Sequence, residues 1–186
     1  MNPIEDLIQN FQELAAQVPE ALQPLVVALA GAIPFIEGEG GAIIGVVGGV
    51  PLILAAAAAA AGNFLSVLVV VLLGSRARHA VVDRRAVHAA AAGAAGGGTV
   101  ATLNAVPAAP ESKGRQRFKR WLVRFGVPGA SLLGPLAVPT QFTSAMLVAA
   151  GTPRGWVLLW QAAAIILWTT VAAVSIWAAL TFVIGA

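Results

Sequence analysis

Cysteine is absent from this chain of 186 residues, and histidine occurs only twice. Without cysteine there is no disulfide framework and no thiolate metal site, and two histidines are too few for an ordinary metal centre. Charged side chains are also scarce, at 10% of the residues, whereas 59% are hydrophobic. This balance excludes an ordinary soluble domain and predicts one small, all-α integral membrane protein.

The motifs of common enzymes are missing as well. The sequence holds no Gly-x-x-x-x-Gly-Lys-Ser/Thr phosphate loop, no His-Glu-x-x-His zinc motif and no visible Ser-His-Asp constellation. We therefore expect neither an enzyme nor a bound cofactor.

Long apolar stretches dominate what is present. Pro51 to Gly74 and Trp156 to Ile184 are each long enough to cross a bilayer, because about 20 apolar residues suffice. Four other apolar stretches are only about half a span long, which predicts two re-entrant helical hairpins, each followed by a transmembrane helix. The stretches pair as 22–35 with 42–50, and 126–138 with 141–150.

Charge predicts the orientation. Ten of the eleven basic residues lie between Arg76 and Arg124, together with only two acids. By the positive-inside rule the loop 76–124 is cytoplasmic, and both termini then lie outside. A basic strip beside a membrane span needs no nucleic acid to explain it, so we expect no nucleic-acid partner. Alanine and glycine are abundant and arginine far exceeds lysine, which indicates a GC-rich bacterial genome. We expect the protein to lie in the bacterial inner membrane.

These observations divide the chain into four regions. They are an N-terminal amphipathic helix over 1–20, the first hairpin and transmembrane helix over 21–75, the basic loop over 76–124, and the second hairpin and transmembrane helix over 125–186. Within the loop, Arg76 to His88 is expected to prolong the preceding helix and Ala89 to Pro110 to form a linker. Residues 113–125 are expected to form a basic amphipathic helix on the inner leaflet.

The two halves also share a spacing. Pro34 and Pro51 are 17 positions apart, Pro135 and Pro153 are 18 apart, and each second proline precedes a long apolar segment. Because one unit would enter the membrane from outside and the other from the cytoplasm, the sequence predicts an inverted repeat, as in secondary transporters.

Two carboxylates interrupt the first apolar stretch in Glu37-Gly38-Glu39-Gly40-Gly41. An acid near the bilayer centre costs about 2.5–3.5 kcal/mol on insertion scales, and it usually marks an ion or substrate path. Glycines and prolines are expected to make the turns and breaks of the two hairpins, at Pro34, Gly38, Gly40, Gly41, Pro135 and Pro139. Glu37 and Glu39, so close together, would share protons.

Polar side chains elsewhere complete the expected site. Asn63 in the first span either lines the site or bonds another helix. Thr140, Gln141 and Thr143 at the second hairpin tip either supply neutral ligands or cap the half-helix. Gln161, Thr169 and Thr170 are expected to pack between helices. The tips should meet, with Glu37, Glu39 and Asn63 facing Thr140 and Gln141 across a polar cavity.

Several of these segments resemble a known family. Ala32 to Gly41, Gly62-Asn63-Phe64, Arg124-Phe125-Gly126 and Gly134 to Thr140 are similar to the small multidrug export proteins, relatives of the DedA/VTT membrane proteins. The resemblance covers roughly residues 22–182, and it implies two opposed re-entrant hairpins with Glu37 and Glu39 as acidic site residues. The second hairpin departs from the DedA pattern, because no arginine lies between Gly126 and Pro153.

The sequence therefore predicts a small secondary transporter, with proton-coupled efflux of small cationic or amphipathic compounds. Its partners would be membrane lipids, a small-molecule or lipid substrate, and protons or another coupling ion; assembly into a homo-oligomer stays open. Two alternatives remain: DedA-like translocation of lipid phosphates, and a membrane scaffold subunit that transports nothing.

Overall fold

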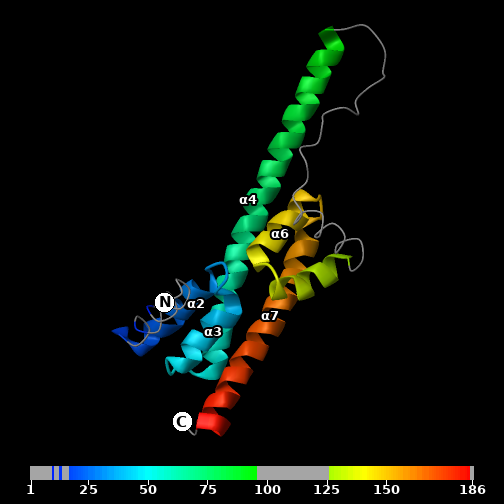
Figure 1. Cartoon of the computed structure of the whole chain (residues 1–186). Helices are drawn as coiled ribbons and strands as arrows, with labels where there is room; N and C mark the ends of the chain where they lie inside the picture. The colour runs from blue at the N-terminus through cyan, green and yellow to red at the C-terminus, as the bar shows by residue number, and fades with distance from the viewer. Residues whose placement is uncertain (1–9, 11–12, 14–16, 96–125, 185–186) are drawn as a thin grey trace.

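The computed structural model describes residues 10, 13, 17–95 and 126–184, and helices joined by turns make up this part of the chain (Figure 1). The all-α prediction is confirmed there, since the described residues contain no strand. The N-terminal amphipathic helix predicted over 1–20 lies almost entirely outside the described residues, and the one predicted over 113–125 lies wholly outside them. The first element described is a short 3₁₀ turn, η1 (Glu20–Leu22).

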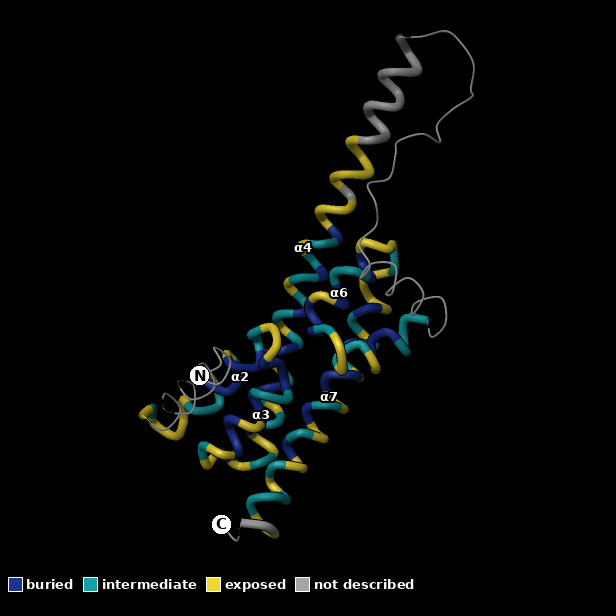
Figure 2. Tube along the Cα trace, viewed as in Figure 1, coloured by how far each residue is buried: buried dark blue, intermediate teal, exposed yellow. Residues whose placement is uncertain are grey.

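Two long helices form the frame. α4 (Leu52–Ala95) and α7 (Arg154–Ala178) are long and apolar enough to cross a membrane, as predicted. Only 28% and 22% of their most apolar stretches are buried, so most of each faces outward, unlike a core helix of a soluble protein (Figure 2). The two helices run antiparallel, since Ala55 and Ala173 belong to one apolar cluster whereas Val71 and Val157 belong to another (Figure 1). α7 ends in a π-helical turn, η3 (Ala179–Ile184).

The first long helix continues well past its apolar part. The predicted extension over Arg76 to His88 is confirmed, but the helix runs on to Ala95. The linker predicted from Ala89 therefore begins too early, because alanine has the highest helix propensity and a run of alanines prolongs a helix already formed.

An N-terminal helix pair packs on the first part of α4. It consists of α2 (Gln23–Gly31) and α3 (Glu37–Val47), joined by a turn at 32–36 that contains Pro34. The turn predicted at the Glu-Gly run is wrong, because Gly38, Gly40 and Gly41 lie inside α3.

Close packing explains those glycines. A Cβ at Gly41 would lie 3.0 Å from the backbone of Gly31, and one at Gly38 only 2.0 Å from Thr169 Oγ1 of α7. A Cβ at Gly40 would meet the side chain of Ile36 at 2.8 Å. Gly38 and Gly41 therefore serve helix–helix approach instead of a turn, whereas Gly40 makes room for Ile36 at the start of its own helix.

A C-terminal helix pair packs further along α4. It consists of the helical residues 126–133 and α6 (Thr140–Ala149), separated by the 3₁₀ turn η2 (Gly134–Leu136). The predicted break is confirmed: Pro135 lies within η2, and Pro139 is the N-cap residue of α6. An indole N–H of Trp168 ties this pair to α7 by donating to the carbonyl of Leu132 at 2.8 Å.

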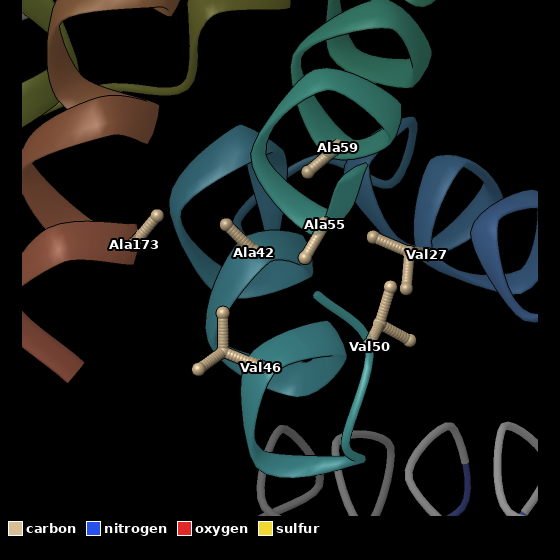
Figure 3. Packing of buried hydrophobic residues seen from close by; sticks show 7 residues of the cluster. All are labelled: Val27, Ala42, Val46, Val50, Ala55, Ala59 and Ala173. Carbon is tan, nitrogen blue, oxygen red and sulfur yellow. The ribbon is translucent and has the colours of Figure 1, made fainter. Parts of the chain in front are cut away.

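Each pair contributes to its own apolar cluster. The first cluster joins α2, α3, the start of α4 and the end of α7 through small side chains, shown in Figure 3. The second joins α4, α6, residue 130 and the first half of α7. The polar residues predicted to form the site lie between the two clusters or beside the second.

Candidate functional site: a carboxylate shared by two helix starts

Glu37 and Thr140 connect the two helix pairs. The Glu37 carboxylate accepts hydrogen bonds from the backbone N–H of Thr140 and, at 2.8 Å, from its hydroxyl. Each residue is the first of its helix, α3 and α6, so two helix starts meet side by side. The first N–H groups of a helix have no partner within the helix, and its N-terminus favours a negative charge. Glu37 thus caps the start of α6, because Pro139, the N-cap residue, makes no side-chain hydrogen bond there.

Two amides extend this contact to α4. Asn63 Oδ1 lies 3.0 Å from the Thr140 hydroxyl and accepts from Gln141 Nε2 at 3.2 Å. Gln141 Nε2 also donates to Ser66 Oγ at 2.8 Å. We call this group of residues the carboxylate network. It consists of Glu37, Asn63, Thr140 and Gln141, and Ser66 lies at its edge. It joins α3, α4 and α6, whose members are up to 103 positions apart in sequence.

The Thr140 hydroxyl lies within reach of three acceptors. It is 2.8 Å from Glu37 Oε1, 3.0 Å from Asn63 Oδ1 and 3.4 Å from Gln141 Oε1, yet it carries one proton. It can therefore donate to the carboxylate or to an amide, but not to both at once. Which acceptor receives the hydrogen bond depends on whether the carboxylate is ionised, because a charged acceptor makes the stronger bond.

The network is buried and its backbone is strained. Glu37 is 6% exposed, Asn63 and Thr140 are 1%, and Gln141 is 5%. Phe35 and Glu37 adopt left-handed φ angles of 73° and 54°, which cost non-glycine residues about 1 kcal/mol or more each. Such strain persists only where surrounding contacts fix the chain, and it is concentrated at functional sites.

An aromatic contact lies beside the network. The rings of Phe35 and Phe142 are 6.1 Å apart, so the turn before α3 also touches α6 directly. Both side chains are largely exposed.

The structure thus brings together four of the five residues predicted to bind substrate or protons. Glu37, Asn63, Thr140 and Gln141 are joined by direct hydrogen bonds, whereas the sequence predicted that they face one another across a polar cavity. Glu39 is half-buried and is not a member of the network. The binding role of all five residues stays a prediction.

Sequence reasoning missed two members of the surrounding polar set. Ser66 lies one turn after Asn63 on the same face of α4, a spacing that could have revealed it. Ser144 is buried and donates to the Thr140 carbonyl at 2.7 Å, which is a bond local to α6. Within 17–95 and 126–184 no three histidine, aspartate or glutamate side chains gather as metal ligands, and the network contains a single carboxylate.

Comparison with known proteins supplies no relative: no family model, no curated protein and no solved structure matches this chain. Its function must therefore be argued from the carboxylate network and the helices that hold it.

Proposed function

We propose that this protein is a small secondary transporter of the bacterial inner membrane, in which Glu37 exchanges a proton for a cationic or amphipathic substrate. The observation that carries the proposal is a single buried carboxylate held between two helix starts from opposite halves of the chain. Large apolar side chains exposed along both long helices, such as Ile53, Leu65 and Ile166, support a lipid surrounding.

The arrangement of helices suits alternating access. We infer that each short helix pair is a re-entrant hairpin and that the two halves form an inverted repeat. In support, α4 and α7 run antiparallel, and each is preceded by a broken helix pair. In such transporters the binding site lies where half-helix ends of the two repeats meet, as Glu37 and Thr140 do here. The basic residues after Arg76 assign the 76–124 loop to the cytoplasm.

Protonation of Glu37 would operate the switch. When ionised, the carboxylate attracts a cation and takes the Thr140 hydroxyl bond. Once protonated, it loses its charge and can itself donate to Thr140 Oγ1, which frees the hydroxyl proton for Asn63 Oδ1, 3.0 Å away. The change in partner alters the contact between the two halves, and the cation leaves because its counter-charge is gone.

The charge of the site favours a cation over a lipid phosphate. Residues 126–153 contain neither lysine nor arginine, so no guanidinium from the second pair can neutralise a phosphate beside Thr140. The carboxylate would repel such a group. Translocation of lipid phosphates is therefore the second candidate, and a scaffold subunit without transport is the third.

Transport in reconstituted vesicles tests the proposal. Wild-type protein should move a fluorescent cationic dye in response to an imposed pH gradient, and Glu37→Gln should abolish that movement while keeping the hydrogen bonds from Thr140 to Oε1. Glu39→Gln, two residues away and outside the network, is the matched control and should retain most activity. Equal loss in both variants, or transport unaffected by Glu37→Gln, would remove the network from the mechanism. Movement of a polyprenyl phosphate without dye transport would favour the second candidate.

A further inference from the structure

Besides Trp160 and Thr169, four buried polar side chains have hydrogen-bonding atoms without a partner among the described residues. They are Asn63 through Nδ2, Ser131 and Thr143 through their hydroxyls, and Gln161 through both amide atoms. Each of the four residues is at most 1% exposed. Burying an amide or hydroxyl without a hydrogen bond costs roughly 2–7 kcal/mol, so native proteins nearly always satisfy such groups with protein or with ordered water.

The four groups come from four different helical segments but belong to one region. Each lies next to, or one turn from, a member of the second apolar cluster: Ser131 adjoins Ala130, Asn63 precedes Val67, and Thr143 precedes Leu147. Gln161 lies between two members, Val157 and Ile165, on the core face of α7. Because α4, α6, α7 and residue 130 pack together there, the four side chains lie in one packed region.

Asn63 belongs both to the carboxylate network and to the four side chains with unpartnered atoms. Its Oδ1 accepts hydrogen bonds within the carboxylate network, whereas its Nδ2 has no partner among the described residues. One amide therefore connects Glu37 and Thr140 with the region around Gln161. That region lies toward the start of α7, because Gln161 is only two turns after Arg154.

We infer that Asn63, Ser131, Thr143 and Gln161 line a pocket of ordered water that continues the carboxylate network toward the start of α7 and serves as the proton route of Glu37. The chemistry of the lining supports water as the occupant. Two hydroxyls and two amides provide both donors and acceptors but no charge, so they match neither a phosphate nor a metal ion. A chain of water between such groups conducts protons.

The inference rests on the proposed function only in naming the proton as the species that moves; the presence of water in the pocket is independent of transport. On the orientation proposed above, the start of α7 faces the cytoplasm, so the route would connect Glu37 with that side. The lining residue Gln161 was expected from sequence to pack between helices, and hydration gives it a reason to be polar.

Single-cysteine variants test the pocket, since the natural chain contains no cysteine. Gln161→Cys in membrane vesicles should react with a small, water-soluble methanethiosulfonate reagent about tenfold faster than Val157→Cys and Ile165→Cys, because a thiolate forms only where water solvates it. The controls lie one turn to either side on the same face and are 0% and 2% exposed. Labelling of the Gln161→Cys variant no faster than the controls would overturn the inference.

Gln161→Leu supplies a second measurement if the cysteine variant fails to fold. Where the amide is hydrated, leucine displaces bound water and should not raise the melting temperature of the detergent-solubilised protein. Where the amide is dry, leucine removes an unsatisfied group and should raise it by several degrees, which would also overturn the inference. Fast labelling of the Gln161→Cys variant together with unchanged dye transport in Glu37→Gln would retain the water pocket and reject the proposed transport mechanism.

Discussion

Replacement of Gly62 by alanine should destabilise the protein by forcing α2 away from α4. A Cβ at this position would lie 1.8 Å from the carbonyl oxygen of Ala28 and 2.6 Å from its carbon. Both are backbone atoms of α2, so no side-chain rotation can relieve the overlap. The helices must separate by roughly 1 Å, and overpacking of this kind costs about 1–3 kcal/mol. Helix propensity returns at most about 1 kcal/mol, which leaves a net loss.

Gly74→Ala is the matched control, because it makes the same chemical change in the same helix. Its Cβ would meet only Val148 Cγ1, at an ordinary contact distance of 3.7 Å. Without a collision the gain in helix propensity remains, so this variant should be as stable as wild type or up to about 1 kcal/mol more stable. Gly62→Ala should therefore be less stable than wild type, and Gly74→Ala at least as stable as wild type.

Thermal unfolding in detergent, followed by tryptophan fluorescence, measures the effect. We expect Gly62→Ala to melt several degrees below wild type and Gly74→Ala at or above it. If Gly62→Ala melted at the wild-type temperature, the close approach of α2 and α4 would be wrong, and with it the placement of the N-terminal helix pair.

Three further predictions concern the site and the topology. Gly38→Ala should destabilise the fold, because its Cβ would lie 2.0 Å from Thr169 Oγ1, and Thr169→Ala in the same chain should restore much of the loss; strictly additive melting shifts would contradict this contact. Thr140→Val keeps the side-chain shape but removes the hydroxyl bond to Glu37, which should cost about 1.5–3 kcal/mol in chemical denaturation, and an unchanged midpoint would argue against the bond. A carboxyl-terminal alkaline phosphatase fusion should be active, since both termini are expected outside; activity only from a cytoplasmic reporter would reverse the topology.

Hydrophobic pattern and proline positions predicted the helical class, the two long helices and the break before α6. The two long helices follow from unbroken apolar runs, and the break before α6 follows from Pro135 and Pro139, which constrain the backbone wherever they occur. These signals are local, so they can be interpreted without knowledge of tertiary contacts.

Glycine was misinterpreted because its role depends on tertiary contacts, which the sequence does not show. A glycine in a sequence indicates either a turn or a close approach, and only the neighbour distinguishes the two. At Gly38 that neighbour is Thr169, which lies 131 positions further along the chain. The turn instead uses Phe35 and Glu37 in left-handed conformations, which few sequences would suggest for non-glycine residues.

Four of the five residues of the carboxylate network were predictable from the sequence, but the geometry of the network was not. An acid, an asparagine and a polar helix start in apolar surroundings are rare enough to stand out, and Glu37, Asn63 and Thr140 were found in that way. Sequence alone could not separate Glu37 from Glu39, because the difference lies in which carboxylate reaches the start of α6. Nor could it show that Gln161 is buried without a partner among the described residues, a property of four helical segments packed together.

Proton release on substrate binding tests the central claim most directly. Detergent-solubilised protein in weakly buffered solution, at a pH where Glu37 holds its proton, should release about one proton for each cation bound, because the cation and the proton compete for one carboxylate. Glu37→Gln should release none, while Glu39→Gln should behave as wild type. Cation binding without proton release in wild type, or release that persists in Glu37→Gln, would contradict the role of Glu37 as the site of exchange.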